Sequence, residues 1–460
     1  MDPGQNLHLL FFPLMSPGHF IPMVDMARLF ASRPNVHCSL VTTPANTISI
    51  PGVDVITIPF PDPTITGLAP GQENLANVPT SDFNTFVTAL FHFRDPIAAL
   101  LRELRPDALI SDSLFPWSAA TADELHIPRI IFHGAGAFPL FVTSKVLSHF
   151  PIQTPSFTIP GLPHDIQLHK DGLPELFANF QMLQLLGEAE AASYGVVINT
   201  FRDMEPSYVD YYKNNHRAWC VGPLSLCSRE GRREEAHEVL SWLDLQPEGS
   251  VIYVCFGSLC HFPPAQLREI AVGLEKSGER FVWVVRREAG EDEVKEEEWM
   301  PEGFEERVKG RGVVVRGWVP QVSVLRRAAV GWFVTHCGWN SVQEGAVAGV
   351  GLVTWPLFHE QFINQELVVE VMGMGVRMWE GFRRIKGEEA AVKAEEIAGV
   401  VKRVVGGGGG EEVERVKKRA KEYGEMAKKA VEVGGSTYED VGSLVEELVA
   451  RRRERSVAGA

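Results

Sequence analysis

Short apolar runs alternate with helical patterns along most of the chain. Two of these runs are almost continuous in hydrophobic residues and end in turn-forming residues, namely residues 7–14 (LHLLFFPL) and 251–258 (VIYVCFGS). A buried parallel strand that leads into a helix has this pattern, because both of its faces are covered. We therefore expect each run to open a domain of alternating strands and helices.

Further strands are expected after both opening runs, at residues 36–44, 108–115 and 128–134 in the first half, and at 280–286, 312–320, 331–335 and 351–358 in the second. This alternation predicts two doubly wound α/β domains. A polar stretch at 223–240 separates them, so we expect domains at 1–236 and 237–439, with a C-terminal helix of about 440–460 that can pack back on the first. A ligand crevice is expected between the domains, at the carboxyl ends of both sets of strands.

Two other segments are not expected to bind a ligand. The charge run at 288–298 predicts a solvated loop, and the glycine run at 406–410 predicts a spacer between helices. The glycine run follows no strand and carries no Lys or Ser, so we do not expect it to hold phosphate.

Composition narrows the classes of partner. The 460 residues are 45% hydrophobic, enough for two cores, and the formal net charge of −15 argues against nucleic acid and anionic membranes. The cysteines are scattered along the chain and form no CxxC pair. This distribution is typical of a protein whose thiols are reduced. Neither a signal peptide nor an apolar run of roughly 18 to 20 residues is evident. We expect a cytoplasmic monomer without a membrane span that binds small molecules.

The segment 318–361 contains most of the candidate ligand-binding residues. Residues 331–335 predict a strand, His336 to Gly338 a turn, and Trp339 the start of a helix. Backbone N–H groups at a helix start form an anion site, which a pyrophosphate could occupy. His336 can donate to a phosphate oxygen, as can two polar residues of the helix start, Asn340 and Ser341.

Five other polar or aromatic residues suit a nucleotide sugar. Glu344 can accept both hydroxyls of a ribose, which Gln321 could also reach. Helix capping by Ser341 and Glu344 is the alternative interpretation. Trp318, expected at the end of a strand, could stack on uracil or belong to the core. Glu360 and Gln361 are expected at the carboxyl end of strand 351–358, where they could bind sugar hydroxyls.

A candidate general base comes from the first half. His19 follows the first expected strand, and Asp112 ends the buried segment ALISD (108–112), the first part of the strand expected at 108–115. A carboxylate beside an imidazole fixes its tautomer and stabilises its protonated form. The competing Asp107 precedes its strand and should lie at the opposite end of the sheet. A structural role for His19 is the alternative.

The segment 318–361 resembles the signature of plant family 1 UDP-dependent glycosyltransferases. The resemblance covers essentially the whole chain, and the stretches FFPLMSPGHFIPMVDMARLF and SDSLFPWSAATADELHIPRIIFHG are most similar to the group 73 branch. The resemblance implies the GT-B fold, an α/β architecture of two Rossmann-like domains facing each other across a cleft. It also implies that the first domain holds the acceptor and the second holds the UDP-sugar.

The resemblance further implies a role for each matching residue. His19 matches the family's catalytic histidine and Asp112 its partner. The donor residues are Trp318 and the Val319 backbone for uracil, Gln321 and Glu344 for ribose, Ser258, His336, Asn340 and Ser341 for the phosphates, and Trp339, Glu360 and Gln361 for the sugar. A terminal Gln, as at 361, is associated with glucose in this family, so UDP-glucose is the expected donor.

The expected reaction inverts the anomeric centre and gives a β-glucoside of a flavonoid or another phenolic. UDP-glucose is the co-substrate, and neither a metal nor another cofactor is expected, since no DxD motif or ligand cluster occurs. Met15, Phe115, Phe138 and His359 are candidates for the acceptor pocket. Terpenoid or steroid acceptors, C-glycosylation and extension of an existing sugar are alternatives. A non-catalytic UDP-sugar binder also remains open, whereas a nicotinamide oxidoreductase is disfavoured by the absence of GxGxxG.

The chain departs from the family pattern at a few positions. Gly351 replaces the usual Pro, Gln343 a common Leu, and Glu360 a frequent Asp. None of these removes a donor contact outright. His359 replaces a small residue, so its ring is either exposed and inert or in contact with the substrates.

Overall fold

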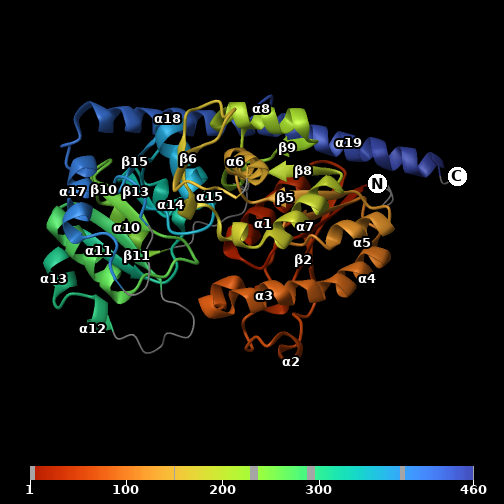
Figure 1. The fold of residues 1–460 in the computed structure, drawn as a ribbon, viewed down its shortest axis with the longest axis horizontal. Coiled ribbons are helices and arrows are strands. Elements are labelled where there is room, and N and C mark those ends of the chain that lie inside the picture. Colours follow the sequence, from red (N-terminus) through yellow and green to blue (C-terminus); the bar gives the residue numbers. More distant parts are fainter. Residues whose placement is uncertain (1–5, 150, 228–236, 287–295, 384–388, 459–460) are drawn as a thin grey trace. The chain divides into compact units, whose positions relative to one another are not determined.

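The computed structural model describes residues 6–149, 151–227, 237–286, 296–383 and 389–458. The chain forms two compact units. The first contains residues 1–137, 176–232 and 428–460, and the second contains residues 138–175 and 233–427. Figure 1 shows the strands and helices of both. The predicted boundary after residue 236 falls at the edge of 228–236, which lies outside the described residues.

The first unit contains a parallel sheet in the order β3-β2-β1-β4-β5-β8-β9. Its strands are β1 (Leu7–Phe12), β2 (Val36–Thr42), β3 (Val53–Thr57), β4 (Ala108–Asp112), β5 (Arg129–His133), β8 (Gly195–Ile198) and β9 (Ala218–Cys220). Its helices include α1 (Pro17–Ala31), α2 (Pro63–Thr66), α3 (Phe83–Ala89), α4 (Arg94–Leu104), α5 (Ser118–Glu124), α7 (Phe180–Ala191), α8 (Pro206–Asn215) and α9 (Leu224–Cys227). The strand order reverses between β1 and β4, and a site is expected at their carboxyl ends.

The second unit contains a parallel sheet in the order β12-β11-β10-β13-β14-β15. Its strands are β10 (Val251–Cys255), β11 (Arg280–Val285), β12 (Gly312–Arg316), β13 (Val330–Thr335), β14 (Gly351–Thr354) and β15 (Gly375–Arg377), and a separate hairpin joins β6 (Ser156–Thr158) to β7 (Gln167–His169). Its helices include α10 (Glu238–Asp244), α11 (Pro264–Ser277), α12 (Glu296–Trp299), α13 (Phe304–Val308), α14 (Gln321–Leu325), α15 (Trp339–Ala348), α16 (Gln361–Glu366) and α17 (Ala394–Val405). Here the order reverses between β10 and β13.

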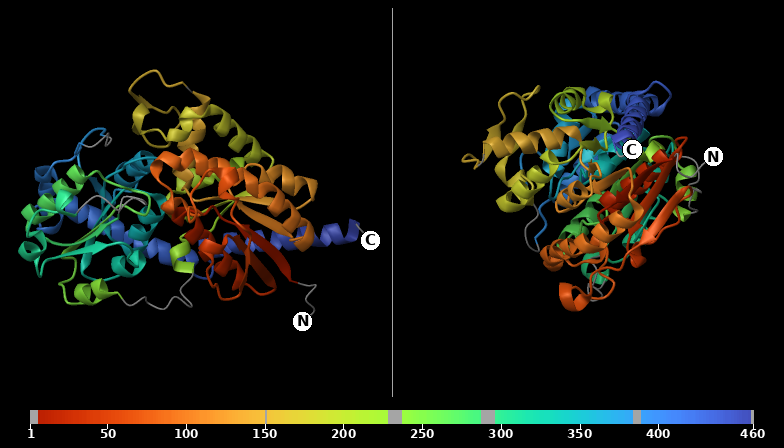
Figure 2. Two further views of the ribbon diagram at one scale, coloured as in Figure 1. Left: turned by 90° about the horizontal axis from the view of Figure 1, so that it is seen from below. Right: turned by 90° about the vertical axis from the view of Figure 1, so that its right-hand side faces the viewer.

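Two helices cross the division between the units, α6 (Ala137–Ser148) and α18 (Gly410–Val431). The predicted C-terminal helix is present as α19 (Ser436–Ala458), the blue helix that leads to the end marked C in Figure 2. It packs against β9 of the first unit. Asp440 fastens it there, because its carboxylate accepts from the Lys213 ammonium at 2.6 Å and from the Cys220 backbone N–H at 2.7 Å.

In the two large sheets, β1, β2, β4, β5 and β10 to β14 were predicted from sequence, whereas β3, β8, β9 and β15 were not. The runs that became β1 and β10 are almost entirely buried, which is why their apolar sequences are continuous. At the edge of the first sheet, β3 is partly exposed and mixed in sequence, so its pattern gives little signal. The glycines at 406–410 separate α17 from α18, as predicted, while most of the charge run at 288–298 lies outside the described residues.

Several predicted strands extend too far, and three of them end close to candidate site residues. Strand β1 ends at Phe12, before the end of the predicted run at residue 14, and His19 lies in the first turn of α1, which begins at Pro17. Strand β12 ends at Arg316, and Trp318 follows it after Gly317, whose φ of 109° turns the chain away. Strand β14 ends at Thr354, so a turn separates it from Glu360 and Gln361.

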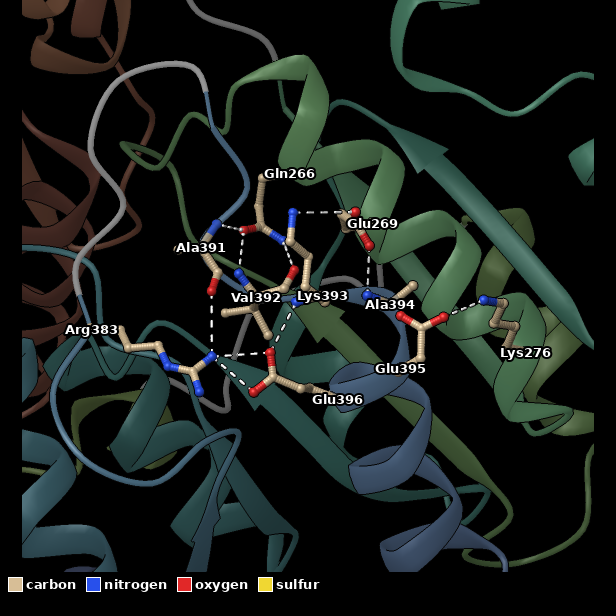
Figure 3. A network of polar contacts seen from close by, with 10 residues as sticks. All are labelled: Gln266, Glu269, Lys276, Arg383, Ala391, Val392, Lys393, Ala394, Glu395 and Glu396. Atoms are coloured by element: carbon tan, nitrogen blue, oxygen red, sulfur yellow. Dashed lines mark hydrogen bonds and ion pairs between the residues drawn. The ribbon is translucent and has the colours of Figure 1, made fainter.

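A polar network fixes the start of α17 against α11 (Figure 3). The Gln266 side chain is fully buried, and its Oε1 accepts from the backbone N–H groups of Ala391 at 2.9 Å and Val392 at 3.0 Å. Its Nε2 donates to the Val392 carbonyl at 2.8 Å. A buried amide with all of these bonds made is stabilising, because its desolvation is compensated. These bonds tie the segment before α17 to α11, and the two helices pack against each other in the second unit.

Within the described part of the chain, no helix combines the length and the apolar character that crossing a bilayer would require.

Candidate active site

The first unit brings His19 and Asp112 together. Asp112 is the last residue of β4, and His19 lies in the first turn of the helix that follows β1. Because β1 and β4 are parallel neighbours, their carboxyl ends meet at the point where the strand order reverses. His19 Nδ1 lies 2.8 Å from Asp112 Oδ2. The pairing predicted from sequence is therefore present in the fold.

The Asp112 carboxylate is held on both oxygens. Its side chain has no exposed surface, while 30% of the His19 side chain is exposed. Oδ2 faces the imidazole, and Oδ1 accepts from the Leu114 backbone N–H at 3.0 Å. A carboxylate bound in this way fixes the orientation of the ring and directs Nδ1–H toward itself. The ring's other nitrogen then has the role of acceptor for a proton.

A buried arginine near Asp112 was not predicted from sequence. Arg129, the first residue of β5, donates to the hydroxyls of Ser118 and Ser193, both at 2.7 Å. Burial lowers the pKa of its guanidinium to about 10, although the Asp112 and Glu190 carboxylates act in the opposite direction. The guanidinium stays charged at neutral pH. The only signal in the sequence was a charged residue at the start of an apolar run.

The second unit has the predicted strand, turn and helix start. Strand β13 ends at Thr335, and α15 begins at Trp339 with Gly338 as its N-cap. No side chain caps this helix, and Ser341 lies inside its first turn. The helix-capping interpretation of Ser341 and Glu344 is therefore wrong. The first backbone N–H groups of α15 keep the orientation that suits an anion.

The His336 ring is packed between two glycines. A Cβ atom at Gly338 would lie 2.3 Å from His336 Nε2, and one at Gly257 would lie 2.7 Å from His336 Cε1. Real Cβ atoms do not approach so closely, so both positions require glycine. Gly257 directly precedes Ser258, which places that predicted phosphate ligand in the loop next to His336, after β10.

The His336 imidazole is neutral at physiological pH. Burial lowers its pKa to about 4, and the charge of nearby His359 acts in the same direction. Its Nδ1 is buried, and no partner for it lies among the described residues. A buried ring nitrogen without a partner is unusual in a folded protein and is typical of a ligand site.

Gln321, Ser341 and Glu344 form one cluster. Gln321 begins α14, and its Nε2 donates to Glu344 Oε2 at 2.8 Å and to Ser341 Oγ at 3.2 Å. Trp318 is 54% exposed, so it is not a core residue, whereas the Val319 side chain is buried. An exposed indole beside a cluster of hydroxyl-binding groups can stack on a flat ring.

The predicted sugar-binding residues lie at the start of α16 and α15. Gln361 is buried, and its Oε1 accepts from the backbone N–H groups of Leu357 at 2.9 Å and Phe358 at 3.1 Å. Glu360 is the N-cap of α16 and is partly exposed. Asn364, which was not predicted, donates to the Cys337 carbonyl at 2.9 Å and ties α16 to the turn before α15. Trp339 and Asn340 are the first two residues of α15. Trp339 is buried, and Asn340 is partly exposed.

The His359 side chain is partly exposed and is held in place by a carboxylate. Its backbone has a φ of 52°, which is rare outside glycine. Glu175 holds it there, because one carboxylate oxygen lies 2.9 Å from the His359 backbone nitrogen and 3.2 Å from Nδ1. Partial burial raises the pKa of Glu175, but the hydrogen bonds and charge of His359 outweigh this and bring it to about 2. Glu175 therefore remains a carboxylate that orients the ring.

The three apolar candidates for the acceptor pocket are buried. Met15, Phe115 and Phe138 have no exposed side-chain surface. Phe115 stacks on Phe12 at a centroid distance of 4.2 Å, inside the core of the first unit. Among the described residues, no group of three or more His, Cys, Asp or Glu side chains is arranged to hold a metal ion.

Known proteins resemble the chain over nearly its whole length. A family model described as UDP-glucoronosyl and UDP-glucosyl transferase matches residues 229–394. A scopoletin glucosyltransferase of Nicotiana tabacum is 41% identical, over 97% of this chain and 98% of that protein. An anthocyanin 3'-O-beta-glucosyltransferase of Gentiana triflora is 41% identical, over 96% of this chain and 98% of that protein.

A solved structure supports the same relationship. The crystal structure of Glycyrrhiza uralensis UGT73P12, complexed with glycyrrhetinic acid 3-O-monoglucuronide, matches with a TM-score of 0.89 at 34% identity, over 99% of this chain and 98% of that one. The chain thus belongs to the plant UDP-glycosyltransferase family, close to its group 73 members, and is a UDP-glycosyltransferase of the GT-B fold with two Rossmann-like domains.

Proposed function

We propose that the enzyme transfers glucose from UDP-glucose to a hydroxyl group of a small apolar phenolic and inverts the anomeric centre. The observation that carries this proposal is the 2.8 Å contact between His19 Nδ1 and the buried Asp112 carboxylate. A protein that only binds UDP-sugar needs no base held by an acid. A transferase with a weakly acidic acceptor does, because phenols have a pKa near 10.

His19 acts as the general base in this proposal. Its Nε2 takes the proton from the acceptor hydroxyl while the acceptor oxygen forms a bond to the anomeric carbon. The bond from that carbon to the phosphate oxygen breaks on the opposite face, and UDP leaves with the electron pair. The α-linked donor thereby becomes a β-glucoside. Asp112 stabilises the imidazolium that His19 becomes.

The donor is held by the second unit in this proposal. Trp318 and the Val319 backbone bind uracil, Gln321 and Glu344 bind ribose, Trp339, Glu360 and Gln361 bind the sugar, and Ser258, His336, Asn340 and Ser341 bind the phosphates. The start of α15 supplies backbone N–H groups and a favourable dipole for the charge that develops on UDP. Neutral His336 adds one N–H donor. No metal ion is invoked for these steps.

The relatives support the proposed acceptor class. Two of them are named for scopoletin and anthocyanin, which supports a phenolic acceptor. A second candidate is an acceptor that already carries a sugar, because the structure of UGT73P12 contains a glycyrrhetinic acid monoglucuronide. Of the four acceptor residues suggested by sequence, His359 alone has an exposed side chain.

The test is acceptor-dependent release of UDP. UDP-glucose would be incubated with the enzyme alone and with each member of a panel of flavonoids, coumarins, triterpenoids and triterpenoid glucuronides. We expect UDP release only with an acceptor, and a product with one added hexose in a β-linkage. Fragmentation separates O-glucosides from C-glucosides. UDP binding without release on any acceptor would reject the proposal in favour of a non-catalytic binder.

A further inference from the structure

A buried tyrosine lies beneath the proposed ribose-binding residues. Tyr253 is the central residue of β10 and has no exposed surface. Its ring packs against Phe333 of the neighbouring strand β13, with centroids 5.1 Å apart. Its hydroxyl donates to Gln321 Oε1 at 3.2 Å. It therefore reaches from the centre of the sheet to the first residue of α14.

The hydrogen bonds of Gln321 are compatible with one orientation of its amide. Glu344 can only accept, so the NH₂ end of Gln321 must face its carboxylate, where it donates at 2.8 Å. The oxygen end must then face a donor. Tyr253 is that donor. With the amide reversed, an oxygen would face the Glu344 carboxylate and an NH₂ group would face the phenol.

The Tyr253 hydroxyl keeps its proton throughout the neutral range. Burial raises the pKa of the phenol well above its ordinary value, and the nearby Cys255 thiol and Glu344 carboxylate act in the same direction. The hydroxyl is consequently a permanent donor at the pH at which the enzyme works. The Cys255 side chain is a second hydrogen-bonding partner of this hydroxyl, which donates to Gln321 Oε1 at 3.2 Å.

We propose that Tyr253 is a positioning residue for the donor nucleotide, one that fixes the amide of Gln321 so that Gln321 and Glu344 are already oriented for the ribose hydroxyls. This inference rests on the proposed function, in which that pair binds ribose. Fixing side chains before the ligand arrives raises affinity, because less conformational entropy is lost on binding. Tyr253 touches neither substrate, so it acts on donor binding and leaves the chemical step unchanged.

The first test is Tyr253→Phe, which removes one hydroxyl and keeps the ring. The loss of one such hydrogen bond should raise the Kd for UDP and the KM for UDP-glucose about three- to tenfold. The kcat should stay within about twofold, as expected for a residue that affects binding alone. Tyr208→Phe is the matched control, because Tyr208 is equally buried in α8 of the first unit and should leave KM unchanged. An unchanged KM in Tyr253→Phe overturns the inference.

A double-mutant cycle separates positioning from a general effect on the core. Gln321→Ala would be measured with and without Tyr253→Phe, with UDP affinity and thermal unfolding as readouts. We expect the effect of Tyr253→Phe on UDP affinity to disappear when Gln321 is absent. An effect that persists undiminished rejects the positioning role. If Gln321→Ala alone leaves UDP affinity unchanged, the ribose assignment in the proposed function fails instead.

Discussion

Burial gives the two histidines of the proposed mechanism opposite properties. His19 faces the carboxylate of Asp112 and can take up a proton, because the positive charge is compensated there. His336 is buried without a carboxylate, and its pKa of about 4 keeps it neutral. One imidazole is suited to act as a base and the other as a hydrogen-bond donor. Their sequences, GHF and THC, do not reveal this difference, which depends on neighbours far along the chain.

Asp112→Asn tests whether the Asp112 carboxylate assists His19. Asn keeps the size of the side chain but loses the charge that stabilises the imidazolium and the preference for Nδ1–H. We expect kcat to fall by roughly 10² to 10⁴, the range for general-base catalysis, while the KM for UDP-glucose changes little. Steady-state kinetics with a saturating acceptor gives both values. A kcat within about threefold of the parent would show that the carboxylate does not assist His19.

The strand-turn-helix elements were predicted well where the sequence pattern changes abruptly. Buried residues 330–335 give way to a glycine and then to a helical pattern, and the helix begins at Trp339 as expected. Strand ends were harder to predict, because apolar residues continue beyond them. Trp318 is outside β12 since Gly317 adopts a backbone conformation that sequence alone does not reveal. Arg129 and Asn364 were missed for a related reason, as their partners lie in other elements.

Gly338→Ala tests the helix start. A Cβ there would meet the His336 ring at 2.3 Å and displace it from the turn. Since the ring is proposed to bind the diphosphate, we expect the KM for UDP-glucose to rise about tenfold or more, on the scale of one charge-assisted hydrogen bond. Calorimetric titration with UDP measures the same loss directly.

The matched control is Gly399→Ala in α17. A Cβ at Gly399 would meet nothing within 4 Å, so the replacement should leave UDP binding unchanged and stabilise the helix by up to about 1 kcal/mol. Equal UDP affinities in the two variants would contradict the proposed role of the turn.

At the scale of the whole molecule, both sheets reverse their strand order between two central strands, and the residues singled out from sequence gather at these points. His19 follows β1 and Asp112 ends β4, while Ser258 and His336 follow β10 and β13. The duplicated pattern of apolar runs was enough to predict two such sheets. The assignment of residues 138–175, which include most of α6 and the β6–β7 hairpin, to the second unit was not predicted, because it depends on contacts that a sequence pattern does not reveal.

The stability of the first unit should depend on pH through Glu190. This α7 residue accepts hydrogen bonds from His133 of β5 and Tyr212 of α8. Burial raises the pKa of Glu190, but the charge and hydrogen bonds of its partners outweigh this and bring it to about 2. A carboxyl whose pKa is lowered by folding stabilises the folded state above its unfolded pKa, and this contribution is lost as the pH falls toward the folded value.

Glu190→Gln should therefore lower Tm at pH 7, by an amount that corresponds to about 1 to 2 kcal/mol for charge-assisted hydrogen bonds. The difference from the parent should shrink between about pH 5 and pH 3. Thermal melts across this range measure it. Glu188→Gln, an exposed neighbour on the same helix, is the control and should have little effect. A difference that stays constant with pH would contradict the assignment.

The most direct test of the central claim is His19→Ala, assayed with UDP-glucose and the best acceptor of the panel, with the Kd for UDP measured in parallel. Loss of the general base should reduce kcat by at least about 100-fold. UDP affinity should be unchanged, because the donor is proposed to bind the second unit. Turnover within about threefold of the parent, with UDP still bound, would contradict the account of His19 as the catalytic base.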